Sequence, residues 1–518
     1  MATISTYRRI YGQFFTPEPV VACCYALLVG ALPPAPRIVD PACGDGAFLR
    51  YAVAHGLTAG ENLYGCDVDA GLVGQLRAGG LANVRCADGL DAASLPEAWF
   101  DLVIGNPPFG VTPGPHPTPL PAGGEGRAGR ARRARYSSEV CFLLRALQLA
   151  RPGGYVALVL PSGVLANERL RAVRAGLVER CTVLAVIALP RDTFRSAGTS
   201  AACSVVLLRV EAPPPGHRVF FGLAAHLDDL PALVAAYLPS RPHPAPVPPP
   251  RQRRGGQEEG WRGAGGGVAY WLPQTAALAQ RMDAHFWRPD ERLLLERIGA
   301  RYPLRPLGEL LEKRRNLIAG DHVRPSRGEA KGPGLPYEYY QTREFMAAGY
   351  NYARLERCDE RAYRRLRHTA VQQYDILVSC AGVGGAGQGR VCLVTHRPGP
   401  SCTGDVFILR VREPDPVALF LFLSSRAGRA QLLRLQNGVG TANLSTDELL
   451  QVQVPLLPLA MQRNLAARYA PIAAAHDRAM AALAGGDLAG FERERAWSEV
   501  HLTELKRAYE EAIGLSGG

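Results

Sequence analysis

The sequence lacks the features that would place it in or across a membrane. It has no apolar run long enough to span a bilayer, and its start, MATISTYRRIYGQFF, has no apolar segment typical of a secretory signal. We therefore expect a cytoplasmic protein that makes no membrane contact. None of its 12 cysteines forms a Cys-x-x-Cys pair, and they are scattered among apolar segments. This pattern predicts reduced, mostly buried thiols and no metal site.

The composition is basic. The 518 residues include 59 Lys and Arg against 47 Asp and Glu, which gives a net charge of +12 and an isoelectric point near 9.2. This charge suits a polyanionic partner, although basic cytoplasmic proteins are common enough that charge alone decides little. The length allows two or three domains with a sizeable core.

A complete dinucleotide fingerprint is also absent. A short strand ending at Asp40 leads into a Gly-rich turn, 41–46, and a helix to about Ala54, which is the nucleotide-binding start of a doubly wound sheet. The third glycine of G-x-G-x-x-G is missing because position 49 is Leu. An acid at the end of the strand, Asp40, would repel a pyrophosphate but attract an ammonium group.

Two further predicted strands end in acids. Asp67 follows Gly44 by about the twenty residues at which an acid meets ribose hydroxyls, and Asp88 could accept a hydrogen bond from an adenine amine. Each acid alone would more often be a solvated loop carboxylate. Acids at three consecutive strand ends beside one Gly-rich turn instead indicate a ligand with an adenosine and an ammonium group.

The segment Phe100–Gly105 reads as a buried parallel strand, and Asn106-Pro107-Pro108-Phe109 follows in the loop at its carboxyl end. The prolines restrict the backbone of this loop. The Asn106 side-chain oxygen and the Pro107 carbonyl could then accept the two N–H groups of an exocyclic amine, while Phe109 covers the adjoining ring. The alternative is a proline-rich turn that simply ends a core strand.

These two motifs together resemble the S-adenosylmethionine-dependent DNA adenine-N6 methyltransferases in which the cofactor motif precedes the catalytic one. The opening Phe15-Thr16-Pro17 resembles the segment that closes over the methionine part of the cofactor in this family, although Thr16 by itself is predicted to be the N-cap of a helix. The resemblance implies that the cofactor-binding residues are Phe15, Thr16, Pro17, Asp40, Ala42, Cys43, Gly44, Asp67 and Asp88. It implies that the catalytic residues are Asn106, Pro107, Pro108 and Phe109.

Two groups of residues are candidates for substrate contact. The Gly- and Pro-rich stretch 110–135 carries Arg130, Arg132 and Arg133, which could bind DNA phosphates or belong to a solvated loop. Phe194 could form a second aromatic wall for a flipped base, but a core role is at least as plausible.

Alternating strands and helices up to about residue 210 predict an α/β fold with a doubly wound, mostly parallel sheet of the class I methyltransferase, Rossmann-like kind. We expect a catalytic domain over 1–237 and a Pro-, Gly- and Arg-rich linker over 238–268. Residues 269–458 resemble the target-recognition domains of type I restriction specificity subunits, and so predict a mixed α+β domain that reads DNA. Residues 459–518 are predicted to be helical, either a packing hairpin or a contact for a second copy or a partner subunit.

The expected activity is therefore site-specific methylation of adenine N6 in double-stranded DNA, in a restriction-modification or similar defence system. The expected cofactor is S-adenosylmethionine, with no metal. No nuclease constellation is evident, so a restriction endonuclease would be a separate partner. The alternatives are a methyltransferase for RNA or for a protein glutamine, and a non-catalytic DNA-recognition subunit.

Overall fold

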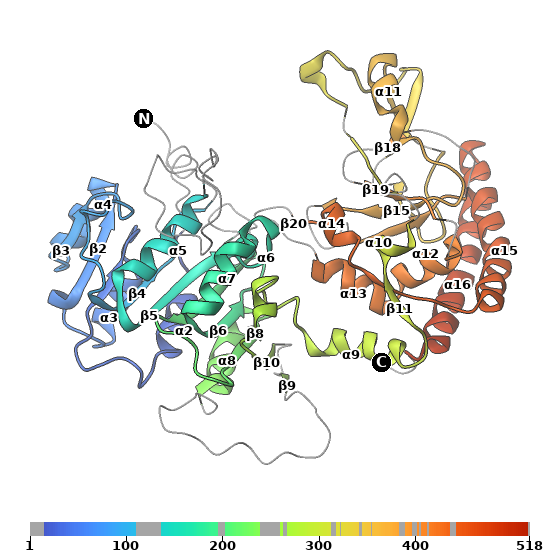
Figure 1. Cartoon of the computed structure of the whole chain (residues 1–518). Coiled ribbons are helices and arrows are strands. Elements are labelled where there is room, and N and C mark those ends of the chain that lie inside the picture. Colours follow the sequence, from blue (N-terminus) through green and yellow to red (C-terminus); the bar gives the residue numbers. More distant parts are fainter. Residues whose placement is uncertain are drawn as a thin grey trace, which may run out of the picture. The chain divides into compact units, whose positions relative to one another are not determined.

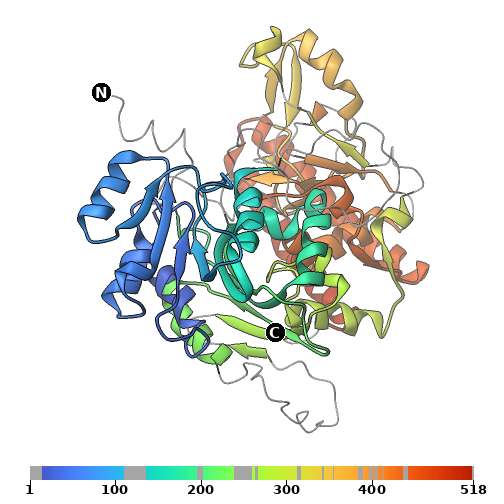
Figure 2. The same cartoon turned by 60° about the vertical axis from the view of Figure 1, so that its left-hand side comes forward.

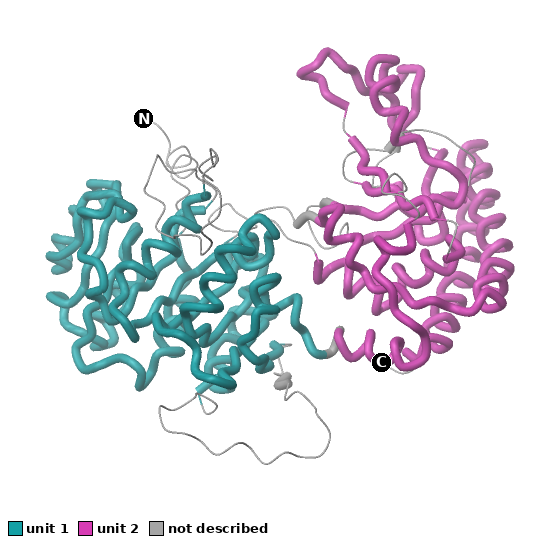
Figure 3. The backbone as a smooth tube through the Cα atoms, in the orientation of Figure 1, with its two compact units in different colours: residues 1–289, 438–440 teal, residues 290–437, 441–518 magenta. Residues whose placement is uncertain are grey.

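The chain divides into two compact units (Figure 3), residues 1–289 with 438–440, and residues 290–437 with 441–518. The computed structural model describes residues 15–109, 136–194, 202–238, 260–262, 267–311, 317–321, 323–340, 344–353, 355–382, 389–395, 401–402, 406–411, 414–435 and 442–515. Unit 1 denotes the first of these units and unit 2 the second.

In the described part of unit 1, ten strands form one sheet in the order β3-β2-β1-β4-β5-β7-β6-β8-β10-β9 (Figure 1). The strands are β1 Ile38–Asp40, β2 Leu63–Asp67, β3 Asn83–Cys86, β4 Phe100–Gly105, β5 Ala150–Pro161, β6 Thr182–Ala188, β7 Cys203–Arg209, β8 Arg218–Leu223, β9 Gly260–Arg262 and β10 Val268–Pro273. The neighbours from β3 to β5 are all parallel, whereas β7 is antiparallel to both β5 and β6. The carboxyl ends of β1 to β4 therefore meet at one edge of the sheet, where such folds carry their ligands.

Helices cover both faces of this sheet (Figures 1 and 2). They are α2 Glu18–Ala26, α3 Ala47–Ala54, α4 Ala70–Ala78, α5 Ser138–Leu149, α6 Ser162–Ala166, α7 Arg171–Arg180 and α8 Leu230–Tyr237. Side chains alternate along β4, so Leu102 and Ile104 pack in the cluster that includes α2, α3 and α8, while Val103 packs in the cluster that includes α5 and α7. The predicted doubly wound α/β fold is confirmed, with the antiparallel strands confined to the second half of the sheet.

The Pro-, Gly- and Arg-rich stretch that we expected to link two domains instead lies inside unit 1. Strand β10 pairs with β8, so both flanks of the stretch join the same sheet. The chain then stays in unit 1 to Pro289, because Arg174 of α7 donates to the carbonyls of Ala279 and Gln280. The unit boundary thus falls about twenty residues after the expected 268. Strand pairing with β8 and the burial of Tyr270 and Leu272 outweigh what the composition suggests.

Unit 2 mixes helices with small sheets that are antiparallel except for the parallel pair of β13 and β18. Its four-stranded sheet has the order β12-β19-β15-β17, and a three-stranded sheet has the order β14-β13-β18. The strands are β11 Leu304–Pro306, β12 Leu317–Ala319, β13 Tyr337–Tyr340, β14 Glu356–Cys358, β15 Ile376–Ser379, β16 Ala381–Gly382, β17 Val391–Leu393, β18 Ser401–Cys402, β19 Val406–Leu409, β20 Ala442–Asn443 and β21 Gln453–Pro455. The helices are α9 Pro289–Gly299, α10 Leu307–Leu310, α11 Glu360–Leu366, α12 Pro416–Ser424, α13 Arg426–Leu435, α14 Thr446–Leu449, α15 Leu459–Ala484 and α16 Leu488–Ala512.

The two C-terminal helices form a hairpin (Figure 1), with the break at Gly485 and Gly486. Of the two interpretations of 459–518, a packing hairpin or a contact for another subunit, the structure shows packing within the unit: α15 and α16 both pack on α12, whose residues from Val417 to Leu423 are all buried. The hairpin therefore belongs to the core of unit 2. No helix in the described ranges has the length and apolar character needed to cross a bilayer.

Candidate functional site

The Gly-rich turn after β1 is held by its own backbone N–H groups. The amide of Ala42 donates to Asp40 Oδ1 (3.0 Å), and the amide of Gly44 donates to Asp67 Oδ2 (2.7 Å). Gly44 and Gly46 have φ values of 53° and 76°, a conformation that glycine adopts at little cost. The turn therefore joins the ends of β1 and β2 into one rigid corner, with α3 starting directly after it.

Asp40 is buried at this corner, with a side chain only 2% exposed. Burial raises the pKa of its carboxyl group from 3.8 to about 8, and the nearby carboxylates of Asp67 and Asp45 raise it further. Burial also raises the pKa of Asp67, whose other oxygen accepts from the amide of Asp69 (2.9 Å). The corner thus gathers negative charge that a cationic ligand would stabilise.

Asp88 lies on the turn that follows β3, next to the same corner. Its Oδ1 accepts from the amide of Leu90 (2.9 Å), and the side chain is exposed. A Cβ on the next residue, Gly89, would lie 1.9 Å from the carbonyl oxygen of Pro41, so the turn packs directly on the backbone of the Gly-rich segment. The three acids predicted from the strand ends therefore lie around one corner of the sheet.

The proposed catalytic loop begins where this corner ends. A Cβ on Gly105, the last residue of β4, would lie 2.6 Å from Asp40 Oδ1. The pairing of β1 with β4, Val39 with Val103, produces this approach. The carboxylate of Asp40 and the residue that precedes Asn106 are therefore in contact, and the two sequence motifs share one site.

Asn106 is fixed by a residue from the start of the described chain. Its Nδ2 donates to Thr16 Oγ1 (3.1 Å), which joins the Phe15-Thr16-Pro17 segment to the catalytic loop. The prediction that Thr16 caps a helix is wrong, because α2 has Pro17 at its N-cap and no side-chain cap. The hydroxyl bonds to Asn106 instead.

Residues 5–228 match the family model described as N-6 DNA Methylase. This part of the chain is therefore similar to the N-6 DNA methylases, and the term methylase domain denotes this matched part below. The match covers the Gly-rich corner and the Asn106 loop together. The second unit lies outside it.

Several curated proteins are similar to this methylase domain. The type I restriction enzyme StySPI methylase subunit of Salmonella potsdam is 26% identical over 226 residues, which cover 36% of this chain and 38% of that protein. The EcoKI methylase subunit of Escherichia coli K12 is 25% identical over 226 residues, with the same coverage. The type II methyltransferase M.TthHB8I of Thermus thermophilus is 28% identical over 178 residues, which cover 33% of this chain and 39% of that protein. The chain thus spans well under half the length of each of these relatives.

Similar solved structures include the type IIG restriction endonuclease BpuSI, with a TM-score of 0.44 and 13% identity over 96% of this chain and 67% of that one. Another is the type IIL restriction-modification enzyme MmeI in complex with DNA, with a TM-score of 0.42 and 10% identity over 96% of this chain and 72% of that one.

Two aromatic rings of the methylase domain meet beside the loop. The rings of Phe109 and Phe194 are edge to face, with centroids 6.4 Å apart and planes at 88°. Both belong to the apolar cluster that includes α2, and they are 6% and 1% exposed. The structure therefore places Phe194 against Phe109 and packs it in the core. Its role as a wall for a flipped base stays a prediction.

The remaining predicted site residues differ in exposure, and some lie outside the described ranges. Pro107 is buried and Pro108 is half-buried, while Phe15 is 40% exposed. Arg130, Arg132 and Arg133 lie in 110–135, outside the described residues. Their predicted phosphate contacts stay untested.

Sequence reasoning missed Arg145 of α5, which is 3% exposed and contacts the turn that carries Asp88. A signal was present, because this arginine occupies a position inside the apolar pattern of an amphipathic helix, between Leu144 and Ala146. Buried arginines of this kind normally satisfy several acceptors at once.

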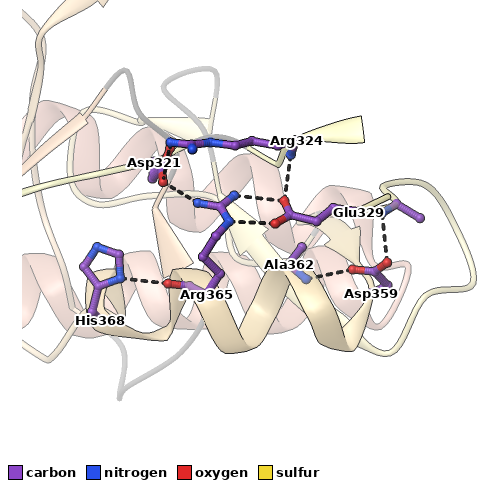
Figure 4. Close-up of polar contacts among 8 residues, drawn as sticks. Asp321, Arg324, Glu329, Asp359, Ala362, Arg365 and His368 are labelled. Carbon is purple, nitrogen blue, oxygen red and sulfur yellow. Dashed lines mark hydrogen bonds and ion pairs between the residues drawn. The ribbon is translucent and has the colours of Figure 1, made fainter. Parts of the chain in front are cut away.

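Unit 2 holds a second candidate surface, which we call the arginine hollow. It is lined by Arg327, Glu329, Glu360, Arg361, Arg364 and Arg365. Arg365 anchors it (Figure 4), with its Nε and Nη2 donating to the two carboxylate oxygens of Glu329 (2.6 and 2.9 Å) and its Nη1 bonded to Asp321. The guanidinium of Arg365 lowers the pKa of Glu329 to about 2.

Two exposed arginines of the hollow lie close to the residues that Arg365 holds in place. Arg327 and Arg361 are both exposed, and neither makes an ion pair with any residue that the structure describes. They lie close together, because a Cβ on Gly328 would be 3.1 Å from Arg361 Nη1. Arg364, by contrast, pairs with Glu360 (2.6 Å). The hollow is therefore lined by two exposed guanidiniums that form no ion pair with a described residue.

Proposed function

We propose that this protein transfers a methyl group from S-adenosylmethionine to the N6 amine of adenine in duplex DNA, as the modification component of a restriction-modification system. The observation that carries the proposal is the contact between Asp40 and Gly105, which puts an acidic nucleoside corner directly beside the Asn106 loop. The family match of residues 5–228 and the restriction-modification relatives support it.

The residues at the corner fit this cofactor. Asp40 is a buried carboxylate whose pKa is raised by burial and by other acids, and no described cation is paired with it. An ammonium group of the methionine part would compensate that charge. Asp67 would accept from the ribose hydroxyls, since a carboxylate that already accepts two backbone N–H groups still has lone pairs available. Asp88 would accept from the adenine amine of the cofactor.

When bound, the cofactor supplies a methyl group activated by its positively charged sulfur. The contribution of the chain is positioning. Thr16 accepts from Nδ2 of Asn106, which leaves the other end of that amide as the acceptor for the target amine. The Pro107 carbonyl would accept the second N–H of the amine, and Phe109 with Phe194 would pack on the extruded ring.

We propose that unit 2 selects the DNA site. The arginine hollow supports this assignment, because two exposed and unpaired guanidiniums on a fixed frame suit the phosphates of a nucleic-acid backbone. Such contacts position a duplex without reading its sequence, so base-reading residues lie elsewhere in the unit. A separate endonuclease, a specificity subunit and a second copy bound through α15 and α16 are proposed partners. Light scattering on the purified chain tests for the second copy.

The decisive experiment is methyl transfer by the full chain. Purified protein is incubated with S-adenosylmethionine labelled in the methyl group and with unmethylated genomic DNA, and the DNA is digested to nucleosides. The expected product is labelled N6-methyladenine, identified by mass spectrometry. Label that appears only in RNA or in protein glutamine, or no label at all, would contradict the proposal.

A further inference from the structure

Arg145 is the most extensively bonded buried side chain next to the proposed cofactor corner. Its Nη2 donates to the carbonyls of Asp91, Ala92 and Leu95 (3.3, 3.3 and 3.1 Å), and its Nε donates to the carbonyl of Gly89 (3.4 Å). Nη1 donates to Glu97 Oε1 (2.5 Å) and to Gln148 Oε1 (3.4 Å). One guanidinium therefore holds four backbone carbonyls of a single turn.

That turn is irregular, and besides Arg145 it is held by single hydrogen bonds such as those from the amide of Asp91 to the carbonyl of Asp88 and from Arg85 Nη1 to the carbonyl of Ser94. Residues 87–99 contain no helix or strand, so no regular backbone ladder fixes them. Within the turn, the amide of Ser94 and the hydroxyl of Ser94 both bond to the carbonyl of Asp91 (3.1 and 2.6 Å). The carbonyls that remain would otherwise face the interior without donors, and a guanidinium with five N–H groups in a fixed plane matches them.

The turn is attached to the cofactor corner at its other end. The Cβ that Gly89 lacks would overlap the carbonyl of Pro41, so Gly89 is pressed between Arg145 and the Gly-rich segment. Asp88 directly precedes Gly89, and its own carboxylate bonds to the amide of Leu90. Arg145 of α5 therefore bonds to the residue that directly follows Asp88.

We infer that Arg145 is a positioning residue for recognition of the cofactor's adenine, acting through Asp88. The inference rests on the proposed function for the identity of the ligand. Arg145 is buried and has a single carboxylate partner, Glu97. Burying its charge costs desolvation free energy, which an apolar side chain of similar volume would avoid while packing α5 equally well. The arrangement of its bonds, directed at one turn, is what an apolar residue cannot reproduce.

Binding of two product analogues tests this role without any methyl transfer. S-adenosylhomocysteine has the adenine amine, and S-inosylhomocysteine has an oxygen in its place. The wild-type full chain is expected to bind the first at least about tenfold more tightly, since a hydrogen bond to a charged group is lost in the second. In Arg145→Met the affinity for S-adenosylhomocysteine should fall about tenfold, while that for S-inosylhomocysteine changes little, and the preference disappears.

Steady-state kinetics supply a second readout. The Arg145→Met variant should raise KM for S-adenosylmethionine about tenfold and leave kcat within about twofold, because the Asn106 loop is untouched. Arg145→Lys retains the charge opposite Glu97 but has three donors in place of five. It should show an intermediate preference, and it is the variant to measure if Arg145→Met does not fold.

Arg174 offers a matched control. It is 0% exposed and likewise donates to four backbone carbonyls, those of Val164, Asn167, Ala279 and Gln280, on a different part of unit 1. Arg174→Met should lower the melting temperature as much as Arg145→Met and leave the preference between the two analogues at the wild-type value. A loss of preference that tracks melting temperature in both variants would overturn the inference.

The remaining outcomes separate the two proposals. If the wild type binds neither analogue, the proposed cofactor is wrong. If it binds both equally, Asp88 does not recognise the amine and Arg145 has no such role. If it discriminates and both Arg145 variants discriminate as strongly, the positioning role is refuted while the proposed function stands.

Discussion

At the scale of single residues, the missing Cβ of Gly105 lets the proposed cofactor corner approach the proposed catalytic loop. Gly105→Ala would bring a carbon to 2.6 Å from Asp40 Oδ1, so the buried carboxylate must move. We expect the affinity for S-adenosylhomocysteine to fall by about tenfold or more and the free energy of unfolding by about 1–3 kcal/mol. Calorimetric titration and thermal unfolding measure the two. Gly74→Ala, where nothing lies within 4 Å, should bind the ligand normally.

Substitutions at Asn106 and at its partner Thr16 test the proposed catalytic role of the loop. Asn106→Ala removes the proposed acceptor for the target amine but none of the cofactor contacts, so single-turnover methylation should fall by about 100-fold or more while S-adenosylhomocysteine binds normally. Thr16→Val removes only the hydroxyl that bonds to Asn106 Nδ2, and a smaller loss of about tenfold is expected. Undiminished methylation by Asn106→Ala would show that this loop is not the catalytic one.

Asp40 should make cofactor binding depend on pH. Because burial raises its pKa from 3.8 to about 8, the carboxyl group stabilises the fold fully below pH 3.8 and loses that contribution as pH rises through about 8. A cationic ligand binds the ionised form, so its binding releases a proton at pH 7. We expect the affinity to rise by about tenfold per pH unit between pH 6 and 7.5.

Titrations in two buffers of different ionisation enthalpy would measure the released proton. Asp40→Asn should bind weakly and independently of pH over the same range. A wild-type affinity that is flat between pH 6 and 8 would show that Asp40 is already ionised without ligand.

At the scale of elements, the residues at strand ends were predictable and their supporting contacts were not. Asp40, Asp67 and Asp88 could be found because each lies at or just after the end of a short predicted strand, and parallel strands bring their ends to one edge. Arg145 stood out only as a charge inside the apolar pattern of α5, and its bonding partners could not be predicted because they are carbonyls of an irregular turn. The prediction for Thr16 was wrong because its hydroxyl bonds to Asn106, in the loop after β4, although its place before Pro17 is typical of a helix N-cap.

The arginine hollow is formed by α11 and the 3₁₀ turn Pro325–Arg327, and it supports a prediction about ionic strength. If Arg327 and Arg361 each contact one phosphate, their joint replacement by Gln should reduce the slope of log affinity against log salt by about 1.8. Arg463 and Arg468, exposed on α15, provide a control with the same loss of charge. Equal slopes for the two double variants would show a general effect of charge and no contact at the hollow.

At the scale of the whole molecule, the methylase domain extends further along the chain than its composition suggests. A fragment of residues 1–289 retains the bonds from Arg174 to Ala279 and Gln280, and the amide of Met282 on the carbonyl of Leu165 (2.8 Å). We expect this fragment to unfold cooperatively and to bind S-adenosylhomocysteine. A fragment of residues 1–268 loses nearly all of β10 and should do neither. Circular dichroism melts of both fragments decide the matter.

The return of the chain to β8 through β10 also bears on how the protein can be engineered. Because α8 before residues 239–259 and β9 after them both belong to unit 1, added length in this stretch lengthens a connection within one unit, and each doubling of such a length costs about 0.6 kcal/mol. A fluorophore-labelling peptide or purification handle inserted in this stretch would leave the two units connected as before. Exchange of unit 2 for the corresponding unit of another enzyme should instead be made near residue 290.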